Sequence, residues 1–334
     1  MTRASWILVF ALALMTPADS FSKSDKPKKA KEDVDQIGER DVGKGINFYS
    51  IEKEIALGKQ LAQQIESTAK IVDDPVIAEY VNRVGQNLVR NSDAKVPFTI
   101  KVIDSEEVNA FALPGGFFYV NTGLIKLAEG EAELAGVMAH EIAHVAARHG
   151  TKQASRGQLA QFASIPLIFL GGGWAAYGAQ QAMSLAIPMT FLKFSRGFEK
   201  ESDLLGVQYL YKTGYDPTAM VTFFERLQAK EKKKPGTLTK IFRSHPPTGS
   251  RIKNIQRAID ELLPAQSQYA ISTSEFAEVR ARLIGMQARS KPQSRDPNRP
   301  TLKRNPSDGT ISGDDDLEAE DGDERPTLKR RISD

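Results

Sequence analysis

Three of the chain's four histidines lie within ten residues, in the stretch "AHEIAHVAARHG" at positions 139–150. Because positions i and i+4 of a helix share a face, His140 and His144 can direct their imidazole nitrogens at one metal ion. Glu141 stands beside them and can take up and return protons. The neighbouring residues are largely apolar, and buried histidines need a polar partner. This HExxH spacing predicts a catalytic zinc site holding one Zn²⁺ per chain, rather than two unrelated histidines.

A catalytic zinc ion needs a third protein ligand and one open position for water. The extended metzincin pattern would require Gly at 147 and His at 150, but the chain has Ala147 and Gly150, which excludes that subclass. His149 falls on a different part of the predicted helix from the other two histidines. A second predicted helix, in "SRGFEKESD", offers three carboxylates as replacements: Glu199, Glu201 and Asp203.

Other motifs follow in a characteristic order: "NAFALPGG" before a strand, "SRGFEKESDLLG", "GYDPTAM" and "HPPTGSRI". With "HEIAHVAARHG", they make roughly residues 50–263 resemble the HtpX, BepA and CAAX prenyl protease family of gluzincin peptidases. The resemblance implies that Glu199 of an ExxxD motif is the third metal ligand and that Asp203 supports a ligand histidine. It also implies hydrolysis of misfolded or unassembled envelope proteins. Ser202 replaces the family's usual Ala, and Glu201 is expected to be solvated or locally paired.

The expected mechanism follows from these groups. Zinc lowers the pKa of its bound water toward about 7, Glu141 takes the proton, and the hydroxide attacks a peptide carbonyl polarised by the metal. Glu141 then passes the proton to the leaving amine. The sequence further predicts an edge strand that binds an extended polypeptide substrate through main-chain hydrogen bonds. Its residues are Phe117, Phe118, Tyr119 and Val120.

The fourth histidine, His245, lies in the turn "SHPPT" between two predicted helices. The sequence leaves three roles open: a catalytic donor to the oxyanion, a fourth metal ligand that closes the site, and a structural residue. The rigidity that Pro246 and Pro247 give to the turn favours a role at the metal. Arg251 is a lesser candidate for the oxyanion donor.

The elements that must position these residues are mostly helices. "FTIKVID" and the run "FFYV" after a Pro-Gly-Gly turn predict two strands. The fold class is therefore expected to be α+β: a mostly helical zincin-type metallopeptidase domain with a small β-sheet and an HExxH active-site helix. Helical periodicity and capping residues predict helices in 50–66, 74–92, 131–150 with Gly150 as the stop, 195–214, 217–228, 245–263 and 272–286.

Composition divides the chain into four parts. Residues 1–20 have the Arg3, apolar core and small-residue cleavage pattern of a secretory signal peptide. Residues 21–46 predict a flexible linker, 47–286 the zinc metallopeptidase domain, and 287–334 a disordered charged tail. The tail repeats "RPTLKR", and its partner cannot be named from sequence. A periplasmic or secreted location is expected, with peripheral membrane association as an alternative. The absence of cysteine excludes disulfides and zinc thiolates.

Residues 157–192 contain no charged side chain. A membrane-inserting hairpin is one interpretation, but two buried helices broken at Gly171–Gly173 are favoured, because neither half reaches the ~20 apolar residues of a membrane span. Contact of this segment with a membrane surface stays open.

Two alternatives to an exported protease are a chaperone-like client-binding module with structural zinc and an integral membrane protease. The scarcity of long apolar segments disfavours the latter. The net charge of only +3 gives no reason to expect nucleic acid as a partner.

Overall fold

The computed structural model describes residues 30–170, 194–233, 245 and 248–290. All of them belong to one structural unit that ends at Ser290. The predicted signal peptide, the second half of the uncharged segment and nearly all of the predicted tail lie outside the described residues.

The first two helices begin at the residues that the sequence predicts. Helix α1 spans Ile51–Glu66, and the Ser50 side chain accepts a hydrogen bond from the backbone N–H of Lys53 at 3.3 Å. Helix α2 spans Pro75–Arg90 and is capped in the same way by Asp74. Each cap satisfies an N–H group that has no partner inside the helix, so these two predictions are confirmed.

The sheet has three strands, one more than predicted, in the order β1-β3-β2. Strand β1 (Thr99–Ile103) is parallel to β3 (Phe117–Asn121), and β2 (Ala110–Leu113) is antiparallel to β3. The missed strand β2 precedes the short turn Pro114–Gly116, where Gly115 and Gly116 have φ values of 76° and 88°. Glycine adopts this left-handed conformation without steric cost, so the chain reverses here and forms a hairpin.

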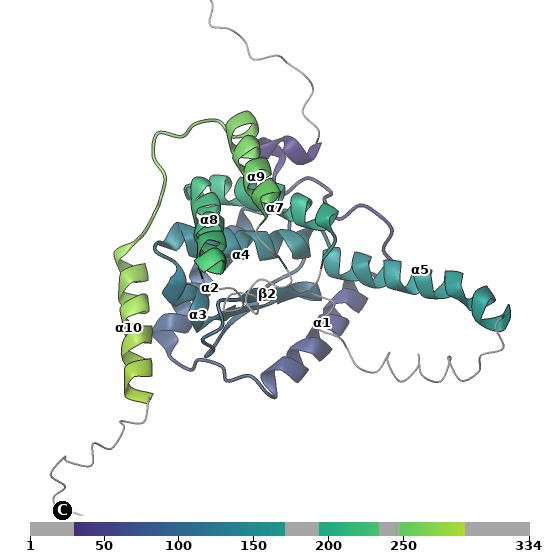
Figure 1. Ribbon diagram of the computed structural model, residues 1–334, viewed down its shortest axis with the longest axis horizontal. Coiled ribbons are helices and arrows are strands. Elements are labelled where there is room, and N and C mark those ends of the chain that lie inside the picture. Colours follow the sequence, from purple (N-terminus) through teal and green to yellow (C-terminus); the bar gives the residue numbers. More distant parts are fainter. Residues whose placement is uncertain (1–29, 171–193, 234–244, 246–247, 291–334) are drawn as a thin grey trace, which may run out of the picture. The chain divides into compact units, whose positions relative to one another are not determined.

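The prediction that Phe117, Phe118, Tyr119 and Val120 form an edge strand is wrong. These residues lie in the central strand β3, whose backbone pairs with β1 on one side and β2 on the other. Their side chains alternate between the two faces, with Phe117 and Tyr119 in the small cluster under α1 and Phe118 and Val120 in the main core. Because β3 is central, β2 forms an edge of the sheet. Figure 1 shows the sheet between α1 and α4.

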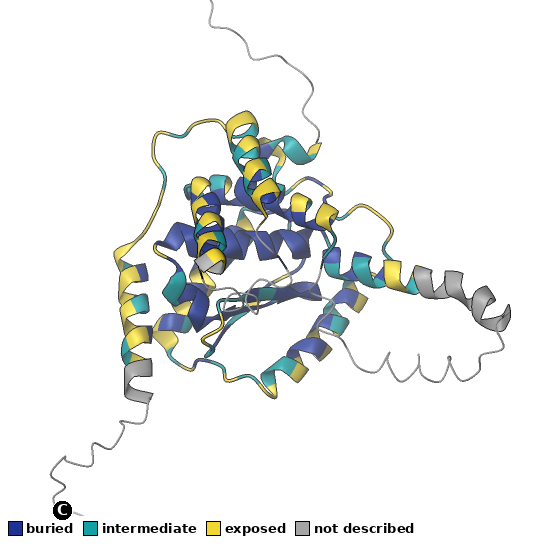
Figure 2. Cartoon of the chain, in the orientation of Figure 1, coloured by how far each residue is buried: buried dark blue, intermediate teal, exposed yellow. Residues whose placement is uncertain are grey.

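The HExxH motif lies on helix α4 (Glu131–Ala146), which follows the short helix α3 (Thr122–Leu127). Every residue of α4 is buried, as the dark blue ribbon of Figure 2 shows. Helix α7 (Arg196–Thr213) packs along α4, where a Cβ on Gly206 would lie 3.2 Å from the backbone N and Cα of His140. The absence of a side chain at Gly206 thus lets α7 bring its carboxylates beside the histidines of α4.

The predicted stop of this helix at Gly150 is wrong. Helix α4 ends at Ala146, Arg148 adopts a left-handed φ of 57°, and α5 (His149–Leu170) begins directly afterwards. The Arg148 side chain holds this kink, because it donates hydrogen bonds of 2.7 Å to both Glu54 Oε2 and the Tyr49 carbonyl. Gly150 lies inside α5 instead, where its Cβ position is 3.1 Å from the Pro114 ring.

Three further helices complete the described chain. Gly214 ends α7 in the left-handed conformation, as predicted, and α8 (Thr218–Lys233) follows. Helix α9 (Gly249–Leu262) packs against α7 and α8, and α10 (Ser274–Ser290) packs against α2 and α3. The sequence predicts that this last helix begins at residue 272, but its cap is Thr273, whose hydroxyl accepts a hydrogen bond from the backbone N–H of Phe276 at 3.1 Å.

The prediction of a flexible linker is wrong for residues 30–42, which we call the N-terminal segment. Two short 3-10 helices, Ala30–Glu32 and Val34–Gln36, lie in it, and Val34, Arg40 and Val42 are buried. Arg40 donates hydrogen bonds of 3.2 and 2.6 Å to the buried carboxylate of Asp93. The few apolar residues suggested disorder, but a buried, doubly hydrogen-bonded ion pair orders the segment.

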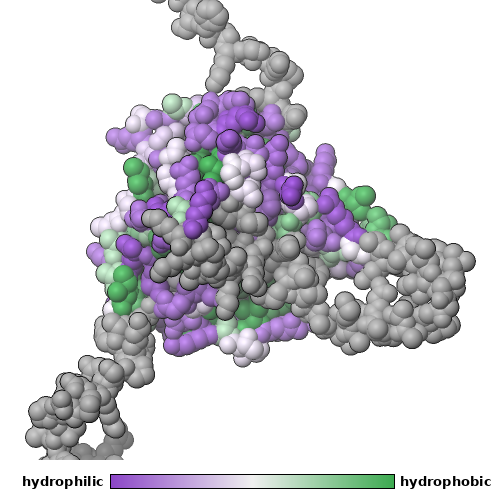
Figure 3. Space-filling model, viewed as in Figure 1, coloured by the Kyte–Doolittle hydropathy of each residue, from purple (hydrophilic) through white to green (hydrophobic). Residues whose placement is uncertain are grey.

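Helix α5 is described as far as Leu170, and the predicted break at Gly171–Gly173 lies outside the described residues. Among the described helices, none combines the length and the apolar composition that crossing a membrane requires. On the face shown in Figure 3, polar residues cover most of the described surface and the apolar ones are scattered among them.

Candidate metal centre

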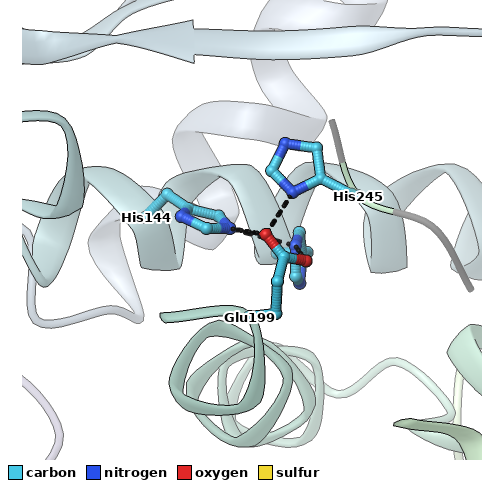
Figure 4. A group of neighbouring side chains, drawn as sticks. His144, Glu199 and His245 are labelled. Carbon is cyan, nitrogen blue, oxygen red and sulfur yellow. Dashed lines mark hydrogen bonds and ion pairs between the residues drawn. The ribbon is translucent and has the colours of Figure 1, made fainter. Parts of the chain in front are cut away.

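Four buried side chains bring one potential ligand atom each to a common point. His140 and His144 come from α4, Glu199 from the first turn of α7, and His245 from between α8 and α9. Their ligand atoms all lie within 4.8 Å of one another. Figure 4 shows the Glu199 carboxylate between the His144 and His245 rings. The structure thus brings together every metal ligand that the sequence predicts, with His245 added.

The spacing of these atoms fits a metal ion. Tetrahedral ligands that each lie about 2.0–2.1 Å from an ion are separated by about 3.4 Å. The Nε2 atoms of His140 and His144 are 3.1 Å apart. Those same two atoms lie 3.6 and 3.5 Å from the Oε2 and Oε1 atoms of Glu199, respectively. Two imidazoles and a carboxylate, all buried, make a donor set suited to a divalent transition metal.

Asp203 and Arg251 support this group from behind. Oδ1 of Asp203 lies 3.2 Å from Nδ1 of His140. Arg251 donates hydrogen bonds of 2.8 and 2.6 Å to the Asp203 carboxylate, and its Nη1 lies 2.9 Å from Oε2 of Glu199. The implied role of Asp203 beside a ligand histidine agrees with this geometry. Arg251, a lesser oxyanion candidate from sequence, holds the two α7 carboxylates instead.

The charges of the centre act strongly on one another. Although burial opposes the charged form, contacts with Asp203 and Glu199 raise the pKa of His140 to about 9. Burial, together with the charges of His140 and His245, lowers the pKa of His144 well below its usual value. Burial opposes ionisation of Glu199, but hydrogen bonds with His140 and His245 lower its pKa. A bound metal ion would displace the proton from His140, because a histidine binds metal in its neutral form.

Glu141 lies next to the four candidate ligand residues but is not one of them. Its carboxylate is 3.7 Å from Nε2 of His245. Burial raises the pKa of Glu141, against the opposing effects of the His245 and His140 charges and of a hydrogen bond with the backbone of Ala112 in β2. A buried carboxylate with a raised pKa is suited to take up a proton during a reaction.

His245 contacts both acidic residues of the centre. Its Nδ1 is 2.7 Å from Oε1 of Glu199, and its Nε2 faces Glu141. The side chain is buried, and its carbonyl accepts a hydrogen bond of 3.1 Å from Arg251. This position fits either role at the metal that the sequence leaves open.

His149 and Glu201 form an additional layer that the sequence reasoning missed. Nδ1 of the fully buried His149 lies 3.0 Å from Nδ1 of His144, and Nε2 lies 3.2 Å from Oε2 of Glu201. Burial opposes ionisation of Glu201, but hydrogen bonds with His149 and Lys31 lower its pKa to about 2. Glu201 was expected to be solvated or locally paired, and the structure shows it paired with His149 and Lys31. No sequence signal pointed to His149, because only the kink at Arg148 turns it back toward His144.

The site combines a helix that carries HExxH with a glutamate from a later helix, and the buried glutamate of the motif can accept a proton beside them. These features define a metallopeptidase centre of the gluzincin type. The chain belongs to peptidase family M48, whose sequence pattern matches residues 75–259.

Similar proteins include the beta-barrel assembly-enhancing protease of Escherichia coli (strain K12), 33% identical over 250 residues, which cover 71% of this chain and 49% of that protein. The mitochondrial metalloendopeptidase OMA1 of Schizosaccharomyces pombe is 31% identical over 183 residues, 54% of this chain and 53% of that protein. The metalloprotease LoiP of Escherichia coli is 28% identical over 202 residues, 60% of this chain and 78% of LoiP. The chain spans about half the length of the first two relatives.

Proposed function

We propose that this chain is an exported zinc-dependent endopeptidase that hydrolyses misfolded or unassembled proteins of the cell envelope. The observation that carries the proposal is the convergence of four buried ligand atoms beside Glu141. The zinc ligands would be His140, His144 and Glu199, with His245 as a fourth. Membership of a peptidase family supports hydrolysis of peptide bonds as the reaction.

Zinc bound to His140, His144 and Glu199, with the position of His245 vacated for water, would lower the pKa of that water molecule toward about 7 and polarise the substrate carbonyl. Glu141 takes the proton from the water and passes it to the leaving amine, since its burial raises its affinity for a proton. Asp203, whose Oδ1 lies 3.2 Å from Nδ1 of His140, would accept a hydrogen bond from that nitrogen and so keep Nε2 directed at the metal, while Arg251 fixes Asp203.

The extended substrate would pair with β2, which replaces β3 as the proposed substrate strand. Backbone N–H of Asn121 donates to the Asn109 carbonyl at 2.9 Å, so in an antiparallel ladder the backbone groups of Ala110 and Ala112 point away from β3. The Ala112 backbone interacts with Glu141, which places this edge beside the proton acceptor. Main-chain hydrogen bonds do not depend on the side chains of the substrate. Pairing of this kind therefore favours binding of unfolded chains in general and does not require one particular sequence.

The cellular setting is inferred from relatives and from the N-terminal sequence. The similar Escherichia coli protein is called a beta-barrel assembly-enhancing protease, which supports a substrate among envelope proteins. The signal-peptide pattern of residues 1–20 supports export to the periplasm or the exterior. Peripheral contact with a membrane through residues 157–192 is compatible with both.

Replacement of Glu141 by Gln tests the proposal. The amide cannot take up a proton, so hydrolysis of an unfolded casein-type substrate should fall by about 10²- to 10⁴-fold while bound zinc stays at one per chain. Glu133→Gln on the same helix is the matched control, because Glu133 pairs with Arg226 away from the metal centre, and should keep its rate. Unchanged hydrolysis by Glu141→Gln would reject the mechanism, whereas no hydrolysis by the zinc-loaded wild-type chain would favour a client-binding module with structural zinc.

A further inference from the structure

The two ligand histidines of α4 are supported from opposite sides. Asp203 and Arg251 stand behind His140. Behind His144, Nδ1 of His149 lies 3.0 Å from Nδ1 of His144. Nε2 of His149 lies 3.2 Å from Oε2 of Glu201. Each histidine is thus connected to a carboxylate, but His144 reaches its carboxylate through a second imidazole.

The direction of the hydrogen bonds follows from the metal side. His144 faces the other ligand atoms with Nε2, so this nitrogen must present a lone pair to a metal and Nδ1 must carry the proton. Nδ1 of His149 then accepts that proton's hydrogen bond, and Nε2 of His149 donates to Glu201. The Ser202 hydroxyl also lies near Nδ1 of His149, at 3.2 Å, but this nitrogen has a single lone pair, and the His144 donor is closer to it.

Packing fixes the His149 ring in this orientation. The ring is fully buried and stacks on Phe198, with a centroid distance of 4.2 Å and an interplanar angle of 21°. Its backbone is set by the left-handed Arg148, which Glu54 and Tyr49 hold. The His149 side chain therefore cannot turn to another partner without disturbing two packed helices.

The carboxylate of Glu201 is held in turn by the N-terminal segment. Lys31 Nζ contacts Glu201 Oε1, and the Lys31 carbonyl accepts hydrogen bonds of 3.0 Å from both Arg40 and Gln208. Arg40 and Gln208 are buried, so the Lys31 backbone has a fixed place. Lys31 thus pairs with the carboxylate behind His144, just as Arg251 pairs with the carboxylate behind His140.

We propose that His149 and Glu201 are positioning residues that fix the proton and ring orientation of the metal ligand His144, with Lys31 securing Glu201. The proposal rests on the proposed zinc centre and adds the layer behind its second histidine. Such outer partners keep a ligand ring oriented and raise its basicity, and their loss weakens metal binding.

Zinc affinity, measured by competition with a chromogenic chelator on the full chain, tests this proposal. His149→Phe keeps the stacking on Phe198 but removes the acceptor, and should weaken zinc binding by about 10- to 100-fold. His149→Asn should recover part of the affinity, because its amide oxygen can take the place of Nδ1. Ser202→Ala is the matched control. It removes the hydroxyl that contacts the same Nδ1 of His149, but this contact is not part of the connection from Glu201 to His144, so the variant should keep the wild-type affinity.

Two further measurements separate positioning from loss of folding. Lys31→Met changes a side chain that is 40% exposed, so the chain should fold normally and bind zinc more weakly, though less so than His149→Phe. The cobalt-substituted protein should show altered visible ligand-field bands in His149→Phe and unaltered ones in Ser202→Ala. Wild-type zinc affinity and cobalt bands in a folded His149→Phe would overturn the proposal, as would a loss of affinity in a folded His149→Asn as large as that in His149→Phe. Because every readout is metal binding, failure of the protease hypothesis would be seen separately.

Discussion

The three acidic residues of α7 differ in role because of their spacing. Glu199 and Asp203 are four residues apart, so they share the helix face that meets His140. Glu201 lies on the opposite side of that helix from them, where it meets His149 and Lys31. Helix periodicity therefore separates the metal ligand from the outer carboxylate, although all three lie within five residues.

Glutamine substitutions should distinguish these roles. We expect Glu199→Gln to lower zinc occupancy strongly, because it removes the charged ligand, and to weaken zinc binding by more than about 100-fold. Glu201→Gln should change it by less than about tenfold, because its amide oxygen still accepts from His149. Metal analysis and chelator competition on both variants provide the measurement. Greater sensitivity at Glu201 would show that the ligand assignment is wrong by two residues.

His245 is expected to act as the fourth ligand, given its place within the ligand group. Its replacement by Ala should open a position for water, so hydrolysis should rise while zinc binding weakens. Steady-state kinetics and metal content on the same preparation check this. A loss of about 10²-fold in kcat with full zinc would identify an oxyanion donor instead. Unchanged values for both would leave His245 a structural residue.

The sequence predicted the local part of this centre well and the non-local part poorly. HExxH is a spacing within one helix, so His140, His144 and Glu141 could be placed from periodicity alone. Glu199 comes from a distant segment and could be assigned only through family resemblance. His149 was missed because its position depends on the φ of Arg148, and a non-glycine residue with a left-handed backbone leaves no mark in sequence.

At the scale of elements, helix α4 carries two of the candidate metal ligands, and hydrogen bonds at its N-terminus fix its position. Glu131, the first residue of α4, accepts hydrogen bonds from the Tyr80 and Tyr215 hydroxyls at 2.8 and 2.5 Å. It also accepts one from Thr273. These donors belong to α2, to the turn after α7 and to the cap of α10. One carboxylate thus joins the active-site helix to three separate parts of the chain.

Removal of this carboxylate should therefore destabilise the fold. We expect Glu131→Ala to lower the free energy of unfolding by about 3 kcal/mol, because it leaves buried hydroxyl groups without an acceptor. Glu129→Ala is the matched control, since its side chain is 67% exposed and its pairing with Arg226 contributes less than about 1 kcal/mol. Denaturant unfolding of both variants measures the difference. Equal stability would show that Glu131 is no anchor.

The strands illustrate why element predictions can fail while the fold class holds. The aromatic run 117–120 was correctly predicted as a strand, since it is rich in residues that favour strands. Its place in the sheet depends on which segments pair with it, and the pattern of one strand does not contain that information. The pairing with β2 follows from the turn at Gly115 and Gly116, whose left-handed conformation makes the hairpin.

At the scale of the whole molecule, the two ends of the described chain relate differently to the core. The N-terminal segment places Arg40 against Asp93, whose carboxylate also accepts a hydrogen bond of 2.9 Å from Tyr209. Beyond Ser290, the sequence is rich in Pro, Asp, Arg and Ser and has little apolar content with which to join a core. The N-terminal segment therefore contributes to the stability of the core, and residues 291–334 are expected to contribute none.

Deletion variants should show this asymmetry. Removal of residues 291–334 should shift the melting temperature by less than about 2 °C and leave zinc affinity and hydrolysis unchanged. Removal of residues 1–42 should lower the melting temperature by about 10 °C, because it leaves Asp93 buried without its cation. This deletion should also weaken zinc binding, since Glu201 loses Lys31. Calorimetry and chelator competition on both variants test the difference. A large loss of stability in the variant without 291–334 would show that the tail packs on the domain, and an unaffected N-terminal deletion would show that the Arg40–Asp93 pair is dispensable.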